Sequence, residues 1–151
     1  MTIYADSSFL VALYLEADVN WSRANAQMAR TASPIAFTPL QRLELRNAIR
    51  LCAWRGHIDE PAAQAAIQQA DEDLRDGFLF HTAASFVDVC RKADELSAHH
   101  PGCRTLDLIH TATALVTKAE VFLSFDDRQK KLARAAGLKV LPKDRSTRKS
   151  R

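Results

Sequence analysis

Cysteine is scarce in this chain, with three in 151 residues. Cys52, Cys90 and Cys103 form an odd set without any CxxC spacing. This pattern argues against a disulfide framework and against a cysteine-based zinc site. We therefore expect free thiols in a reducing compartment and a cytoplasmic protein.

Long apolar runs and phosphate-binding loops are also absent. The apolar run at residues 9–15 is short, follows an aspartate and has no positive cluster before it, so we expect neither a signal peptide nor a membrane span. No glycine-rich phosphate loop occurs anywhere. Asp6 is followed by Ser7 and Ser8, without the second aspartate two residues on that phosphoaspartate enzymes carry.

The composition is that of one soluble globular domain. Hydrophobic residues make up 47% and charged residues 26% of the chain. The net charge of +3 is unevenly distributed, because residues 143–151 hold five basic residues and one acid. We interpret residues 1–142 as the folded domain and 143–151 as a disordered, solubilising tail. A phosphate-attracting arm is the alternative for the tail.

Short apolar segments alternate with longer helical segments along the chain. Strands are predicted at residues 2–5, 34–37, 78–81, 121–125 and 138–141. Helices are predicted at residues 8–16, 21–30, 39–54, 60–76, 86–99, 105–117 and 128–136. This alternation predicts a three-layer α/β domain, with a short, mostly parallel central sheet flanked by helices.

Some helix starts carry capping signals. Thr38, Pro39 and Gln41 form the clearest one, with Thr at the N-cap, Pro at the first helical position and Gln where a capping box requires it. Ser7 or Ser8 can cap the first helix, and Thr105 can cap the helix at residues 105–117.

Four acidic residues lie in otherwise apolar segments: Asp6, Glu44, Asp107 and Asp126. Charged side chains are rarely buried unless they are paired or bind a metal, and no basic residue is dedicated to each of these four. Asp6 and Asp126 follow predicted strands, and ligand sites in open parallel sheets gather where strands end. We therefore predict that the four carboxylates converge.

Four converging carboxylates need a counter-charge. Two unit charges about 5 Å apart repel by about 3 kcal/mol at an effective dielectric constant of 20, so protons or a cation must relieve the cluster. Oxygen ligands without His or Cys favour Mg²⁺, with Mn²⁺ able to substitute. The reaction class that fits such a site is hydrolysis of a phosphodiester.

Five segments resemble those of PIN-domain ribonucleases, in the same order. They are residues 3–8 (IYADSS), 43–48 (LELRNA), 104–112 (RTLDLIHTA), 122–126 (FLSFD) and 137–140 (GLKV). The resemblance covers about residues 2–141, and its short single-domain form is most similar to the VapC-type toxins of toxin–antitoxin pairs.

This resemblance implies a Mg²⁺-dependent endoribonuclease that acts on RNA, often as a homodimer, and that a cognate antitoxin protein inhibits. It implies catalytic and metal-binding roles for Asp6, Glu44, Asp107 and Asp126, with Asp6 and Asp107 binding the cofactor ion. Ser8 and Ser124 match hydroxyl positions that can hydrogen-bond the acids or the waters of the metal.

Several assignments stay open at this point. Asp127 directly follows Asp126, and either can be the fourth acid; we favour Asp126, with Asp127 as a helix cap. Arg46 and Arg104 can hold an RNA phosphate or balance the nearby acids. His110 follows Asp107 by three residues, on or near the same helical face, and has either a packing role or a role near the site.

The apolar residues Leu10, Leu13, Leu43, Leu51, Trp21 and Trp54 are interpreted as core or dimer interface rather than as an RNA-stacking platform. Two further functions compete with the toxin interpretation: a PIN-like nuclease of RNA processing outside any toxin system, and a non-catalytic metal- or RNA-binding module. The presence of all four acids weighs against the second.

Overall fold

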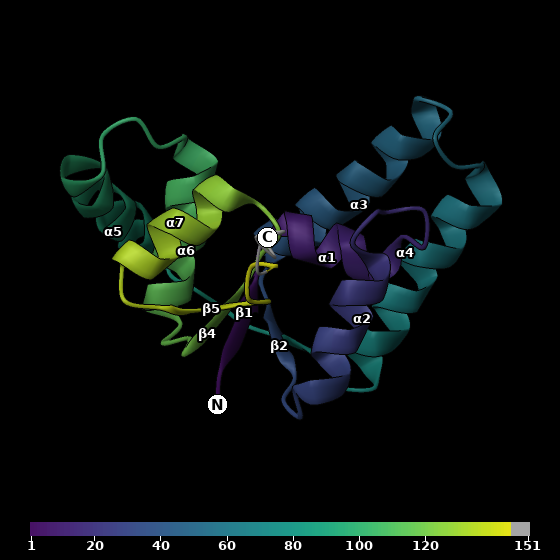
Figure 1. The fold of residues 1–151 in the computed structure, drawn as a ribbon, viewed down its shortest axis with the longest axis horizontal. Helices are drawn as coiled ribbons and strands as arrows, with labels where there is room; N and C mark the ends of the chain where they lie inside the picture. Colours follow the sequence, from purple (N-terminus) through teal and green to yellow (C-terminus); the bar gives the residue numbers. More distant parts are fainter. Residues whose placement is uncertain (146–151) are drawn as a thin grey trace, which may run out of the picture.

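The computed structural model describes residues 1–145 of the chain. Within these residues, five short strands form one sheet and seven helices surround it (Figure 1). Of the basic tail expected at residues 143–151, residues 146–151 lie outside the described part. No helix among residues 1–145 is long and apolar enough to cross a lipid bilayer.

Strands and helices follow one another in the predicted order. The elements are β1 (Ile3–Ala5), α1 (Ser7–Tyr14), α2 (Trp21–Arg30), β2 (Ile35–Phe37), α3 (Pro39–Trp54), α4 (Glu60–Arg75), β3 (Leu79–His81), α5 (Phe86–His99), α6 (Thr105–Val116), β4 (Val121–Leu123), α7 (Asp127–Ala135) and β5 (Lys139–Leu141).

The sheet has the strand order β3-β2-β1-β4-β5, and all four neighbouring pairs are parallel. The prediction of a mostly parallel sheet in a three-layer α/β domain is therefore confirmed. β1 is the central strand, with β2 on one side and β4 on the other. The carboxyl ends of β1 and β4 are adjacent, because Ala5 pairs with Leu123.

The two faces of the sheet are covered by different helices. Ile3 and Ala5 of β1 pack into a core with residues of α1 to α4, whereas Tyr4 packs on the opposite face with residues of α6 and α7. α5 lies outside α6 and shares a third apolar cluster with it. Figure 1 shows the resulting two arms, α1–α4 on the right and α5–α7 on the left.

The predicted capping box at the start of α3 is present and has a second function. The side chain of Gln41 accepts from the N–H of Thr38 at 2.7 Å, and the hydroxyl of Thr38 accepts from the N–H of Gln41 at 3.4 Å. Nε2 of the fully buried Gln41 also donates to the carbonyl oxygens of Ala5 at 2.7 Å and Ala36 at 3.1 Å. One side chain thus ties the start of α3 to β1 and β2.

Other local predictions need correction. β4 ends at Leu123 rather than at Phe125, because Phe125 leaves the sheet and stacks its ring on Phe9 at a centroid distance of 5.3 Å. Thr105 does not cap α6: the N-cap position is Arg104, without a side-chain hydrogen bond.

The large apolar side chains divide into two groups. Leu10 and Leu13 are buried, as a core assignment requires, whereas Leu43 is 64% exposed and Trp54 is 83% exposed. The exposed pair on α3 is therefore not part of the core of the monomer.

We predict that Gln41→Ala lowers the free energy of unfolding by about 2–4 kcal/mol, because it leaves buried backbone groups of β1 and β2 without partners and removes half of a capping box. Denaturant unfolding of the purified protein measures this change. Gln64→Ala is the matched control, since Gln64 is exposed and bonds only to Glu60 of its own helix. Equal stability of the two variants would contradict the assignment.

Candidate functional site

Asp6 stands at the point where β1 passes into α1. It is the N-cap of α1, and its Oδ1 accepts from the N–H of Phe9 at 3.0 Å and from the hydroxyl of Ser8 at 2.6 Å. Its Oδ2 accepts from the hydroxyl of Ser124, just after β4, at 2.6 Å. Asp6 itself, not Ser7 or Ser8, therefore caps the helix, and the predicted hydroxyl partners of the acid are in place.

Burial governs the protonation of Asp6. The residue is only 3% exposed, and loss of water around the carboxylate raises its pKa above the ordinary aspartate value. The hydrogen bonds from Ser124 and Ser8 lower the pKa of Asp6, as do the electrostatic effect of the nearby His110 and the N–H of Phe9, without cancelling the effect of burial. A cation next to Asp6 would therefore stabilise the charged form of this carboxylate.

Glu44 reaches the site from the second turn of α3 and meets His110 of α6. Its Oε2 lies 2.7 Å from Nε2 of His110, yet neither atom makes an aligned hydrogen bond within the described part of the chain. Nδ1 of His110 is 2.8 Å from the hydroxyl of Tyr4 in β1. His110 is thereby fixed between the central strand and Glu44, and a buried oxygen of Glu44 keeps capacity for another ligand.

Asp107 lies in the first turn of α6, and a residue of α7 hydrogen-bonds the backbone of this turn. Nε2 of Gln129, a buried residue of α7, donates to the carbonyl oxygen of Asp107 at 3.0 Å and to the hydroxyl of Thr111 at 2.8 Å. Asp107 as a whole is half-buried. Gln129 therefore fixes the helix turn from which the carboxylate of Asp107 projects.

The adjacent acids Asp126 and Asp127 have different surroundings in the structure. Asp126 is the N-cap of α7: its Oδ1 accepts from the N–H of Arg128 at 2.8 Å and from that of Gln129 at 3.0 Å. The side chain of Asp127 is 94% exposed and lies 3.2 Å from Lys130. The expectation that Asp127 caps the helix is therefore wrong. Asp126 takes the N-cap position, and Asp127 is the first residue of α7.

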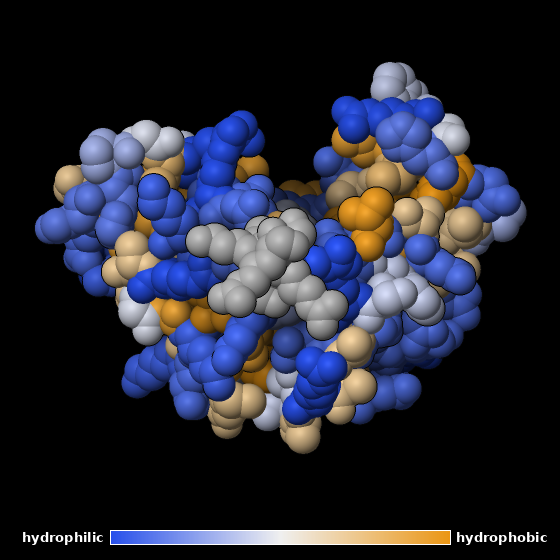
Figure 2. All heavy atoms as spheres, in the orientation of Figure 1, coloured by the Kyte–Doolittle hydropathy of each residue, from blue (hydrophilic) through white to orange (hydrophobic). Residues whose placement is uncertain are grey.

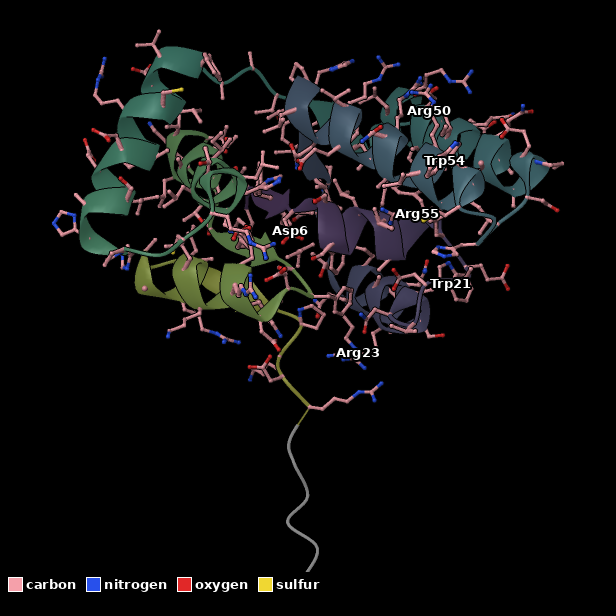
Figure 3. All side chains as sticks on the ribbon, turned by 90° about the horizontal axis from the view of Figure 1, so that it is seen from above. Asp6, Trp21, Arg23, Arg50, Trp54 and Arg55 are labelled. Atoms are coloured by element: carbon pink, nitrogen blue, oxygen red, sulfur yellow. The ribbon has the colours of Figure 1, made fainter. Side chains whose placement is uncertain are left out.

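All four predicted acids line one small pocket, with a cavity volume of about 160 Å³. Asp6, Glu44, Asp107 and Asp126 enter it from β1, α3, α6 and the start of α7, whereas Asp127 does not line it. The rest of the wall is formed by Ser7, Ser8, Arg104, Leu106, His110 and Gln129. Seen from above in Figure 3, Asp6 lies between the two arms of the molecule. Figure 2 shows a notch between these arms, with hydrophilic and hydrophobic residues along its right side.

The donors of this pocket suit a hard divalent cation. They are carboxylate and hydroxyl oxygens, the ligands that Mg²⁺ and Mn²⁺ prefer, and the buried Oε2 of Glu44 makes no aligned hydrogen bond, although Nε2 of His110 lies 2.7 Å away. Among residues 1–145, no three His, Cys, Asp or Glu side chains lie close enough to form a complete metal cage. Magnesium is usually held by one or two carboxylates and keeps several waters, so the donor chemistry fits it without such a cage.

The two arginines near the acids differ in position. Arg104 lines the pocket. Arg46 is bonded to Asp71 of α4, and Arg42 lies 3.6 Å from the same carboxylate; the two arginines hold the pKa of Asp71 below its ordinary value. Arg46 thus joins α3 to α4 and does not line the acidic pocket, which leaves Arg104 as the arginine of the site.

Two residues of the site were not recognised from the sequence. Tyr4 looked like an ordinary strand residue, although a buried tyrosine hydroxyl needs a partner and finds one in His110. Nothing in the local sequence marks Gln129 as buried, and the packing of α7 on α6 buries it. A period-of-four pattern in α7, in which Gln129 shares a face with the buried Ala133, is the signal that could have indicated Gln129.

Several solved structures have a similar fold. VapC20 of Mycobacterium tuberculosis, a sarcin–ricin loop cleaving toxin, has a TM-score of 0.64 at 20% identity, covering 90% of this chain and 95% of that one. VapBC2 of Rickettsia felis, bound to a DNA fragment from its promoter, has a TM-score of 0.62 at 13% identity, with coverages of 93% and 98%.

A third similar structure is VapBC-1 of nontypeable Haemophilus influenzae, with a TM-score of 0.57 at 14% identity and coverages of 93% and 97%. No curated protein sequence matches the chain. The profile of the PIN domain, in contrast, matches residues 3–135, a range that includes all four acids of the pocket. This chain therefore belongs to the PIN domain family.

Proposed function

We propose that this protein is a divalent-metal-dependent endoribonuclease and the toxin of a type II toxin–antitoxin pair. The observation that carries the proposal is the convergence of Asp6, Glu44, Asp107 and Asp126 on one pocket in a PIN-domain chain. The likeness to toxin structures over at least 90% of this chain and 95% of theirs supports the toxin assignment.

In this proposal the acidic pocket holds Mg²⁺, with Mn²⁺ able to substitute, through one or two carboxylates and several waters. Asp6 and Asp107 are the metal ligands that we assign first, and Glu44 and Asp126 bind the ion through its waters. A bound Mg²⁺ would supply neutralisation of the negative charge that develops on the phosphodiester, and a water of lowered pKa. Ser8 and Ser124 keep the carboxylate of Asp6 in a fixed orientation through their 2.6 Å hydrogen bonds.

Two further residues assist the proposed reaction. Arg104 is the arginine that lines the pocket, and there it can hold a non-bridging oxygen of the scissile phosphate. His110 is held by Tyr4 at 2.8 Å and sets the position of Glu44 through their contact. We assign His110 a positioning role, because its side chain is only 3% exposed and its two ring nitrogens face Tyr4 and Glu44.

The partners follow from the same family. We propose a cognate antitoxin protein that binds over the acidic pocket, an RNA substrate, assembly as a homodimer and a cytoplasmic location. Two of the similar structures are VapBC proteins of toxin–antitoxin systems, which supports the antitoxin partner. The exposed Leu43 and Trp54 of α3 offer apolar area to such a partner.

We predict that the purified protein cleaves single-stranded RNA with Mg²⁺ or Mn²⁺ and not in excess EDTA, because carboxylates alone provide no good nucleophile for a phosphodiester. Gel analysis of labelled RNA before chelation, after chelation and after return of Mg²⁺ measures this dependence. Undiminished cleavage in EDTA would exclude a metal-dependent mechanism.

We predict that Asp107→Asn lowers the cleavage rate by at least about 100-fold, because the shape of the side chain is kept and one charge of the pocket is lost. Asp127→Asn is the matched control: Asp127 is a neighbouring helix-start acid of the same type that is exposed and does not line the pocket. Its cleavage rate should equal that of the wild type.

Melting temperatures without metal distinguish two roles of Asp107: a member of the carboxylate cluster, or an acid that only stabilises the start of its helix. Without metal at neutral pH, Asp107→Asn should melt no lower than the wild type, because it relieves repulsion among the remaining carboxylates. A variant that keeps full activity would remove Asp107 from the site, and one that melts clearly lower would point to a structural role.

We predict that induced expression of the chain arrests bacterial growth. We also predict that a short antitoxin gene lies next to its gene and that co-expression of this antitoxin relieves the arrest. Asp107→Asn should abolish the arrest at equal protein level, measured by growth curves and immunoblotting. An RNA-cleaving protein that leaves growth unaffected would favour the alternative of an RNA-processing nuclease outside a toxin system.

A further inference from the structure

A second hollow of the surface is lined by positive charge. It lies between α2 and the segment that follows β5, has a cavity volume of about 550 Å³, and contains four basic residues: Arg23, Arg30, Lys143 and Arg145. Ala26, Gln27, Leu141 and Pro142 complete its lining. No acidic residue lines it, so this hollow, the basic groove, attracts anions.

The cations of the basic groove keep their charge available. Arg30, Lys143 and Arg145 are exposed, and within residues 1–145 none of them forms an ion pair. The acid between the last two, Asp144, instead pairs with Lys130 and Arg134 of α7. The segment after β5 therefore directs its acid to α7 and its basic residues to the groove.

Arg23 links the basic groove to the surface beside the acidic pocket. A hollow next to the acidic pocket shares Ser7, Ser8 and Asp126 with it, and Asn20, Phe125 and the acidic Asp18 also line this hollow.

Arg23 of the groove contacts both Phe125 and Asn20. Its guanidinium lies 5.1 Å from the ring centroid of Phe125, and its Nη1 donates to Oδ1 of Asn20 at 3.1 Å. Figure 3 shows Arg23 next to the yellow segment that follows β5, on one side of Asp6.

We infer that the basic groove binds backbone phosphates of the RNA strand whose scissile phosphodiester occupies the acidic pocket. The inference rests on the proposed nuclease function. Four carboxylates repel a polyanion, so the strand needs cations beyond the pocket to hold it there. Arg23 marks the start of this subsite and Arg30, Lys143 and Arg145 continue it.

The chemistry of the groove favours a flexible single strand over other anions. Exposed Arg and Lys side chains contact phosphates without reading base identity. The described wall offers no unpaired aromatic face for stacking, because the ring of Phe125 is packed between Phe9 and Arg23. The groove therefore contributes affinity and register rather than sequence selectivity.

The test compares two double variants of equal charge. Arg30→Gln/Lys143→Gln removes two cations of the basic groove, and Arg75→Gln/Arg91→Gln removes two exposed arginines of α4 and α5 that do not line it. Binding of a labelled single-stranded RNA is measured by fluorescence anisotropy in EDTA, over a series of salt concentrations. Melting temperatures check that both variants are folded.

The expected result is a smaller salt dependence for the groove variant alone. Each lost phosphate contact lowers the slope of log K against log salt by about 0.7, so the groove variant should lose about 1.4 of the slope. With Mg²⁺, its KM should rise for a long RNA and stay unchanged for a substrate of a few nucleotides, because only the long strand reaches the groove.

Equal slopes for the two double variants would overturn the inference, as would an equal rise of KM for long and short substrates. Failure of the groove inference can be distinguished from failure of the proposed nuclease function. A wild-type protein that binds RNA with a groove-dependent slope but cleaves none would refute the nuclease, while the groove would stand as an RNA-binding site.

Discussion

The rest of the site depends on one buried carboxylate, that of Asp6. It lies at the end of the central strand β1, and its oxygens tie this strand end to two other parts of the chain: the first turn of α1 through Phe9 and Ser8, and the exit of β4 through Ser124. Hydrogen bonds to a charged group contribute about 1.5–3 kcal/mol each, which offsets much of the cost of removing the carboxylate from water. Burial still raises the pKa of Asp6, so the fold holds this acid in a position where a cation stabilises it.

Two other polar side chains extend this arrangement across the molecule. Gln41 joins α3 to the ends of β1 and β2, and Gln129 joins α7 to the first turn of α6. Each is almost completely buried and uses its amide to satisfy backbone carbonyl groups. As a result, the helices that carry Glu44 and Asp107 are fixed to the elements beside Asp6. The pocket is therefore assembled by hydrogen bonds to the backbone, and not by attraction among the acids, which repel one another.

Acidic and basic side chains lie in different regions of the surface. Four acids line the pocket, whereas the basic groove beside α2 has four basic residues and no acidic residue in its lining. Phe125 lies between these regions, with its ring stacked on Phe9 and covered by Arg23. A polyanion that spans both regions would place one phosphate at the acids and others at the cations. Such separation over a short distance gives the strand a direction on the surface, which a uniformly basic protein of the same net charge would not provide.

Much of this fold and most of the pocket were predictable from local features of the sequence. Alternating apolar strands and capped helices gave the order of elements, the parallel sheet and the capping box of Thr38 and Gln41, because backbone propensity and side-chain capping act within a few residues. The four acids were recognisable because each stands in an apolar segment. The sequence also favoured Asp126 over Asp127, because Asp126 directly follows the apolar strand, and Asp126 lines the pocket. Tertiary packing decided the rest: that Arg46 pairs with Asp71 while Arg104 lines the pocket, and that Tyr4 and Gln129 support the site. These outcomes depend on which residues from distant segments meet, and spacing along the chain carries no information about that.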